Sequence, residues 1–234
     1  RLLDVEYLTG ADGTRLVAFG YWAGYAGASL GLLAARGAIE APLSPMSKDA
    51  LDDRLRSSTP AADEAALVVG ARGRSGRGAV DALAVGGITA TTWDRAETDP
   101  IDRDRLRAHT LLVNCVAVST PREPFVTAAD LDAPGSRLAV LTDVTCDVTS
   151  DLNLLPVNTS TTSWEEPVRT LRDGERTVQV VAIDNLPSLL PAEASATFSH
   201  DLLPQLLGLD AMTAPWQHAL EVFDTTSAAV LGPA

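Results

Sequence analysis

Five runs of apolar or β-branched residues, separated by polar or glycine-rich segments, predict the strands of a largely buried sheet. The runs lie at residues 65–69, 88–94, 110–117, 138–144 and 178–184. The last three are nearly continuous in apolar residues, which is typical of parallel strands covered on both faces. The pattern therefore predicts an α/β fold built on a parallel sheet.

The N-terminal residues carry a different pattern. Residues 3–19 alternate between apolar and polar positions on either side of a glycine-containing turn, which predicts a β-hairpin. Glu6 and Arg15 would then face each other across the two strands and could form an ion pair.

Four further segments have helical patterns. Residues 20–35 place small residues at helical spacing, which predicts a helix that packs tightly against another backbone, between domains. Residues 48–56 predict a short amphipathic helix in a connecting segment. Residues 193–207 and 216–230 predict two amphipathic helices near the C-terminus.

Composition narrows the class of protein. The 234 residues carry a net charge of −13, which argues against nucleic acid or an anionic membrane as a partner. No apolar run is long enough to cross a bilayer. Cys115 and Cys146 lie in strand-like segments and are expected to be buried free thiols of a cytoplasmic protein. No Cys/His spacing suggests a metal site.

The first apolar run leads into a glycine-rich turn and then a helical pattern. The glycines are Gly70, Gly73, Gly76 and Gly78, in the spacing G-x-x-G-x-x-G instead of the common G-x-G-x-x-G. In such a turn, glycines permit a sharp bend, close approach to a pyrophosphate and close packing of the helix on the sheet. The turn predicts a dinucleotide site at the helix N-terminus; an ordinary strand-to-helix turn is the alternative.

Asp94 follows the second apolar run. An acid at the end of the second strand is where a dinucleotide's adenosine ribose hydroxyls are bound, and a carboxylate repels the 2′-phosphate of NADP. Asp94 therefore favours NAD, although Arg95 directly after it weakens that preference. The alternative is a solvated acid at a strand end.

Polar residues also end the later strands. They are Asn114, then Thr142 and Asp143, then Asp184 and Asn185. Ligands of open α/β sheets bind beyond the carboxyl ends of the strands, so these side chains predict a site along one edge. Helix capping is the alternative for some of them.

Several blocks of the chain, taken together, resemble the NAD-dependent, L-lysine-forming saccharopine dehydrogenases, a family related to alanine dehydrogenase and transhydrogenase subunits. The blocks are Glu6–Gly31, Gly70–Gly76, Trp93–Asp94, Asn114–Cys115, Asp143–Asp147, Ile183–Pro191 and Phe198–Pro204. The resemblance implies a Rossmann-type NAD-binding domain at 20–185, inserted into a second, partly absent α/β domain. That second domain, which binds substrate, would be formed by residues 1–19 and 186–234.

The resemblance also implies a reaction and its residues. Saccharopine would be oxidatively deaminated by NAD and water to L-lysine, 2-oxoglutarate and NADH, in a monomer or homodimer. Glu6 and Asp184 match catalytic positions, and Arg15 and Asp147 match substrate-binding positions. The positions matching the cofactor site are Gly70, Gly73, Arg74, Ser75, Gly76, Gly78, Asp94, Val116, Ala117 and Asp143.

Some positions depart from the family pattern. The resemblance places the family's catalytic Lys and His upstream of Glu6, and the only lysine of this sequence is Lys48. The 234 residues alone are therefore expected not to catalyse the reaction. Ser75 replaces a cysteine that can pair with Cys115 in some members. Asn185 replaces a histidine beside the nicotinamide, which leaves open a dehydrogenase for another amino-acid-derived secondary amine. A non-catalytic NAD-binding relative is the third possibility.

Overall fold

The computed structural model describes residues 1–174 and 176–231, which form two compact units. One unit is the continuous segment 20–191, and the other combines residues 1–19 with the segment that begins at residue 192. The sequence suggested a boundary after residue 185. The residues that follow instead pack with the sheet, because Leu186, Leu189 and Leu190 are buried in its core.

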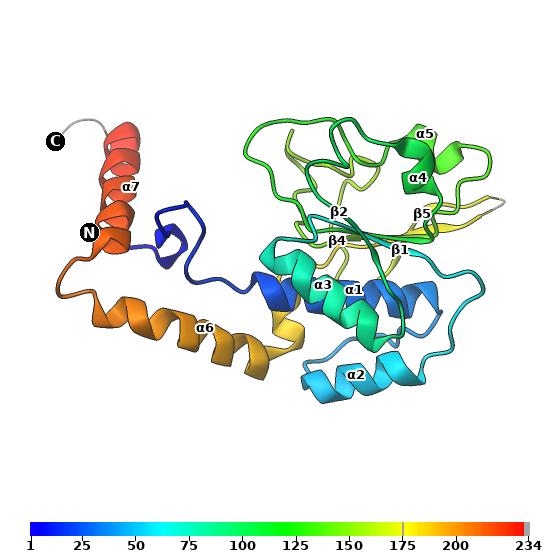
Figure 1. Ribbon diagram of the computed structural model, residues 1–234, viewed down its shortest axis with the longest axis horizontal. Coiled ribbons are helices and arrows are strands. Elements are labelled where there is room, and N and C mark those ends of the chain that lie inside the picture. The colour runs from blue at the N-terminus through cyan, green and yellow to red at the C-terminus, as the bar shows by residue number, and fades with distance from the viewer. Residues whose placement is uncertain (175, 232–234) are drawn as a thin grey trace. The chain divides into compact units, whose positions relative to one another are not determined.

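A six-stranded sheet forms the centre of the unit 20–191 (Figure 1). Its order is β2-β1-β3-β4-β6-β5, and all neighbours are parallel except β5 and β6. The strands are β1 (Ala66–Val69), β2 (Thr91–Trp93), β3 (Leu111–Asn114), β4 (Val140–Asp143), β5 (Arg169–Arg172) and β6 (Val178–Val181). Each of the five predicted runs contains one of the parallel strands, so the predicted parallel α/β sheet is confirmed.

Helices cover both faces of this sheet (Figure 1). Val68 and Val113 share a core with the helices of one face, whereas Leu67 and Leu112 share a second core with Leu106 on the other. The first face carries α1 (Gly20–Ala35), α2 (Lys48–Ser57) and α3 (Arg74–Val85), and the second carries α4 (Arg103–Arg107) and α5 (Ala128–Asp132). β1, β3 and β4 are therefore buried at every position, which is why their sequences are largely apolar without alternation.

The small residues of α1 serve close packing inside this unit. A methyl group added at Gly24 would lie 1.8 Å from the carbonyl oxygen of Ser75 in α3. One added at Gly31 would lie 2.1 Å from Oγ1 of Thr142 in β4. The predicted close helix contact is thus present, but these contacts of α1 are with α3 and β4 of its own unit and not with another domain.

The second unit is formed by residues 1–19 and the segment that begins at residue 192. It contains η1 (Val5–Tyr7, a 3-10 helix), nearly all of α6 (Pro191–Leu207), and α7 (Ala214–Leu231). The predicted hairpin is wrong: only an isolated bridge joins Thr9 to Arg15. The side chain of Asp4 accepts a hydrogen bond from the backbone N–H of Glu6 and caps η1, which competes with strand pairing. Leu8, Val17, Trp216 and Ala219 form the buried core of this unit.

Candidate functional site

The carboxyl ends of four parallel strands lie side by side at one edge of the sheet. Val69 at the end of β1 is in register with Trp93 of β2 and Asn114 of β3, and Asn114 is in register with Asp143 of β4. The strand order reverses between β1 and β3, and ligands of open α/β sheets bind at such a switch point. The polar strand ends predicted from the sequence are therefore brought together.

The glycine turn joins β1 to α3 at this switch point. Gly70 has φ +83°, and its N–H donates to the carbonyl of Trp93 at 2.8 Å. A methyl group at Gly76 would lie 2.1 Å from the carbonyl oxygen of Gly70, so the turn folds back tightly on the start of the helix. Gly73 is the N-cap of α3 and makes no side-chain cap, so no side chain covers the helix N-terminus from that position.

Gly78 has a different contact from the other three glycines. A methyl group there would lie 2.0 Å from the carbonyl oxygen of Tyr21 in α1. Gly78 therefore permits the two helices to pack backbone against backbone, whereas Arg74 and Ser75 form the first turn of α3 next to the glycine turn.

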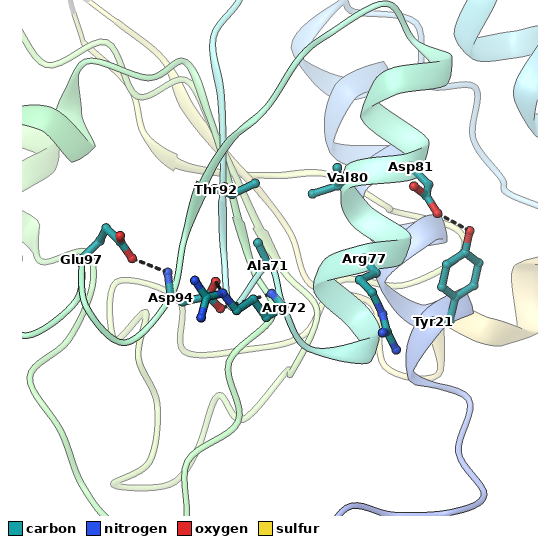
Figure 2. A pocket seen from close by; sticks show the side chains of 9 residues that line it. All are labelled: Tyr21, Ala71, Arg72, Arg77, Val80, Asp81, Thr92, Asp94 and Glu97. Atoms are coloured by element: carbon teal, nitrogen blue, oxygen red, sulfur yellow. Dashed lines mark hydrogen bonds and ion pairs between the residues drawn. The ribbon is translucent and has the colours of Figure 1, made fainter.

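Asp94 follows β2 and contacts the glycine turn directly (Figure 2). Its Oδ1 accepts a hydrogen bond from the backbone N–H of Arg72 at 3.2 Å, and its Oδ2 lies 3.2 Å from Nε of the same arginine. The backbone N–H of Asp94 donates to Oε2 of Glu97 at 2.9 Å. The structure thus joins the turn and the strand-end acid.

A cavity of about 630 Å³ opens beside this acid. It is lined by Tyr21, Ala71, Arg72, Arg77, Val80, Asp81, Thr92, Asp94 and Glu97 (Figure 2). The Tyr21 hydroxyl donates to Oδ2 of Asp81 at 2.7 Å. Burial and the hydrogen bond to Asp81 raise the pKa of Tyr21, so its hydroxyl stays protonated at neutral pH.

A buried polar cluster lies at the ends of β3 and β4. Asn114 and Asp143 are each 1% exposed, and Nδ2 of Asn114 donates to Oδ1 of Asp143 at 3.1 Å. Thr145 donates to the same oxygen through its hydroxyl at 2.8 Å. Oδ1 of Asn114 accepts a hydrogen bond from the backbone N–H of Val116 at 3.1 Å. The cluster therefore holds the backbone that leads past Val116.

A second, smaller cavity of about 280 Å³ begins at this backbone. Val116, Ala117, Thr145, Cys146 and Asp147 line it. Burial, with a further contribution from nearby carboxylates, raises the pKa of Cys146 to about 12. Its thiol is therefore protonated at neutral pH and unsuited to act as a base. Both cysteines of the chain are free and half-buried.

Asp184 lies after β6 on the same edge of the sheet. It is exposed, and its Oδ1 accepts a hydrogen bond from the backbone N–H of Asn185 at 2.9 Å. Asn185 has φ +63°, in the left-handed region, and is the N-cap of η2 (Leu186–Leu189). Asp184 is one of the carboxylates whose charge raises the pKa of Cys146.

Glu6 and Arg15 belong to the second unit, which includes residues 1–19. Nη2 of Arg15 lies 2.5 Å from Oε2 of Glu6, and Nε donates to the backbone carbonyl of Glu6 at 3.1 Å. The predicted ion pair therefore forms although the predicted hairpin does not. Both side chains are partly exposed.

Several residues that line the cavity beside Asp94 were not predicted from the sequence. Arg72 and Arg77 lie within and directly after the glycine turn, so their positions were a usable signal. Asp81 and Glu97 had no such signal, because only packing brings them to this cavity. Among residues 1–174 and 176–231, no group of three or more His, Cys, Asp or Glu side chains is placed to hold a metal ion. In the same residues, no helix has the length and apolar character needed to span a membrane.

The chain is similar to fungal saccharopine dehydrogenases named as NAD-dependent and L-lysine-forming. It is 38% identical to that of Neurospora crassa over 250 residues, which cover 95% of this chain and 65% of the relative. It is 33% identical to that of Candida glabrata, over 97% of this chain and 67% of the relative. Identity to the Schizosaccharomyces pombe protein is 33%, over 96% and 67% respectively. The chain thus spans about two thirds of the length of these relatives.

Solved structures show the same fold. An L-alanine dehydrogenase matches 95% of this chain and 62% of its own, with a TM-score of 0.56 and 17% identity. A transhydrogenase from Sinorhizobium meliloti matches 91% and 61%, with a TM-score of 0.52 and 16% identity. No family model matches the chain. The fold agrees with that of an L-alanine dehydrogenase, and identity of 33–38% to the fungal relatives extends over nearly the whole chain. The chain therefore belongs to the family of lysine-forming saccharopine dehydrogenases.

Proposed function

We propose that this chain forms the NAD-binding domain and part of the substrate domain of an enzyme that oxidises saccharopine to L-lysine and 2-oxoglutarate. The observation that carries the proposal is the glycine turn at the switch point, joined directly to Asp94. A division into an NAD-binding domain and a substrate domain is part of the same proposal, with the compact unit 20–191 as the first and residues 1–19 and the segment from residue 192 in the second.

The turn fits the pyrophosphate of a dinucleotide. A methyl group at Gly70 would lie 2.7 Å from a side-chain methyl of Val116, and one at Gly76 would lie 2.1 Å from a backbone oxygen. Only a chain without side chains at these positions brings its backbone this close to the helix start. The N-terminus of α3, which Gly73 does not cap with a side chain, then offers N–H groups from Ser75 and Gly76 to an anion.

The strand-end acid and the buried cluster would orient the two ends of the cofactor. Asp94 would accept hydrogen bonds from the adenosine ribose. Val116, Ala117 and Asp143 would place the nicotinamide, because the Asn114 amide fixes both Asp143 and the backbone of Val116. When bound, NAD would accept a hydride from the carbon that carries the substrate's secondary amine.

Acids near the sheet edge are proposed to act on the substrate nitrogen. Asp184 is exposed and would stabilise a positive charge on that nitrogen, and Asp147 would bind the substrate beside it. In the other unit, Arg15 would bind a substrate carboxylate and share its guanidinium with Glu6. The negative charge of Glu6 would adjust the pKa values of the catalytic Lys and His that the family resemblance implies.

A related reaction is the second candidate. Asn185 occupies the position at which the family resemblance predicts a histidine, so oxidation of another amino-acid-derived secondary amine is the alternative. A non-catalytic NAD-binding protein is the third.

Two measurements separate these functions. Titration calorimetry with this chain should detect NAD, and Asp94→Ala should weaken NAD by about tenfold or more, the loss typical of hydrogen bonds to a charged group. Absence of NAD binding would refute the cofactor site. The complete gene product should then form NADH from NAD and saccharopine, measured by absorbance. NADH formed only with a different opine would support the second candidate, and NAD binding without any turnover would support the third.

A further inference from the structure

We propose that Arg72 and Arg77 form a site for the 2′-phosphate of an adenosine group, so that this chain binds NADP as well as NAD. This inference rests on the proposed function, because it assigns the adenosine end of the cofactor to the cavity beside Asp94. The two arginines bear on the choice between NAD and NADP, which neither the glycine turn nor Asp94 decides alone.

The charge of Asp94 is already balanced by the protein. Both carboxylate oxygens face Arg72, one at 3.2 Å from its backbone nitrogen and the other at 3.2 Å from its Nε. A bare carboxylate excludes NADP by repelling the 2′-phosphate. An arginine beside the carboxylate offsets that repulsion and presents further N–H donors of its guanidinium to a phosphate.

Arg72 is also free to change partners. Its side chain is 90% exposed, whereas that of Asp94 is 24% exposed. An exposed ion pair is worth about 1 kcal/mol or less, so its rearrangement around a ligand costs little. Arg72 can therefore stay on Asp94 beside a ribose hydroxyl and move toward a phosphate when one is present.

Arg77 adds a second positive charge to the same cavity (Figure 2). It is exposed in the first turns of α3, and no ion pair or hydrogen bond of its guanidinium occurs within residues 1–174 and 176–231. The acids that line the cavity besides Asp94 are engaged: Asp81 accepts from the Tyr21 hydroxyl, and Glu97 accepts from the backbone of Asp94. Among the described residues, Arg77 is thus the charged side chain that lines this cavity without a protein partner.

Arg95 does not have this role. The sequence suggested that Arg95, directly after Asp94, weakens the preference for NAD. The structure leaves Arg95 exposed and outside the lining of the cavity. The two arginines that reach the cavity come instead from the glycine turn and from α3.

The test compares ligands that differ only in the 2′-phosphate. Titration calorimetry with this chain would measure NAD against NADP, and 5′-AMP against adenosine 2′,5′-bisphosphate. We expect NADP to bind within about tenfold of NAD, because the arginine contacts offset the repulsion from Asp94. Arg72→Leu and Arg77→Leu should each weaken the bisphosphate by about tenfold and 5′-AMP by less than about threefold.

Matched variants make the result specific. Arg54→Leu removes an exposed arginine of α2 outside the cavity and should leave all four ligands unchanged. Asp94→Ala should weaken NAD but leave NADP unchanged or tighter, because it frees Arg72. Circular dichroism checks that each variant is folded. If a leucine variant is not folded, the corresponding glutamine variant, Arg72→Gln or Arg77→Gln, takes its place.

The outcomes separate this inference from the proposed function. Binding of NAD and 5′-AMP, with NADP and the bisphosphate weaker by about a hundredfold or more, would overturn the inference and leave the NAD site intact. Equal loss of 5′-AMP and bisphosphate in the arginine variants would also overturn it. If none of the four ligands bound, the proposed function itself would fail.

Discussion

Gly76→Ala tests the geometry of the glycine turn most directly. Gly76 is the third residue of α3, where alanine is intrinsically favoured over glycine by about 1 kcal/mol. The added methyl group would nevertheless lie 2.1 Å from the Gly70 carbonyl oxygen and 2.5 Å from Cα of Ala71. Favourable carbon contacts lie near 3.5–4.0 Å, so the turn and the helix must separate by roughly 1 Å.

The expected loss of stability follows from what must move. Both atoms that meet the methyl group belong to backbone, which yields less easily than a side chain. Overpacking of this kind costs about 1–3 kcal/mol, and a backbone clash belongs to the upper part of that range. For a unit of this size the melting temperature should fall by roughly 4–12 °C. Thermal unfolding followed by circular dichroism measures the change.

Two neighbouring glycines provide controls. At Gly73 an added methyl group would meet only the Gly70 oxygen, at 3.2 Å, and φ is −66°, so Gly73→Ala should cost far less stability. At Gly78 the methyl group would lie 2.0 Å from the carbonyl oxygen of Tyr21, so Gly78→Ala should destabilise about as much as Gly76→Ala.

The two destabilising variants should differ in cofactor binding. Well below the melting temperature, Gly78→Ala should retain NAD affinity because its clash lies between α1 and α3. Gly76→Ala should lose about tenfold or more in NAD affinity, because a shift of roughly 1 Å displaces the N–H groups proposed to bind the pyrophosphate. Wild-type stability and NAD affinity in Gly76→Ala would refute this account of the turn.

The remaining predictions concern buried charge and thiols. The Arg36 side chain is 2% exposed, and its guanidinium donates to both carboxylate oxygens of Glu64 at 2.8 Å. Arg36→Met should therefore lower the free energy of unfolding, measured by urea titration, by about 3–5 kcal/mol. A loss under about 1 kcal/mol would contradict a buried ion pair. Hydrogen bonds from Arg36 lower the pKa of Glu64, so this stabilisation is present above the unfolded pKa of about 4.3 and is lost as pH falls through the lower folded pKa. The urea midpoint of wild type should therefore drop more than that of Glu64→Gln between neutral and acidic pH, and parallel curves would argue against it. Because the pKa of Cys146 is raised to about 12, native protein should be alkylated at Cys146 by iodoacetamide far more slowly than unfolded protein, which mass spectrometry can follow. Equal rates would show that the thiol is not shielded.

Local sequence signals determined most of the sheet. β1, β3 and β4 were recognisable because burial on both faces requires largely apolar residues, as in Leu67 and Val68 of β1. β2 was recognisable from its β-branched residues instead. β5 was missed because it is a short antiparallel edge strand whose residues alternate between half-buried and exposed. The N-terminal hairpin was wrongly predicted because Asp4 caps a 3-10 helix where alternation suggested a strand.

The candidate site shows the same division. The glycine turn and Asp94 could be found from the sequence because a strand–turn–helix motif depends on residues at fixed short spacing. The contact of Arg72 with both Asp94 oxygens depends on β1 and β2 lying side by side, and that of Asn114 with Asp143 on β3 and β4. These pairs lie 22 and 29 residues apart in the chain, so no local pattern announces them.

The sequence by itself determined the α/β class, the five parallel strands, the glycine turn and the acid that follows the second strand, because each depends on neighbours in the chain. Only the tertiary structure decided which polar groups meet. Strand order and register place side chains next to each other that are distant in sequence. The arginines that surround the cavity beside Asp94 acquire their significance in this way. Arg95 is nearest to Asp94 in sequence, but Arg72 and Arg77 line the cavity, because the turn and α3 follow β1, which pairs with β2.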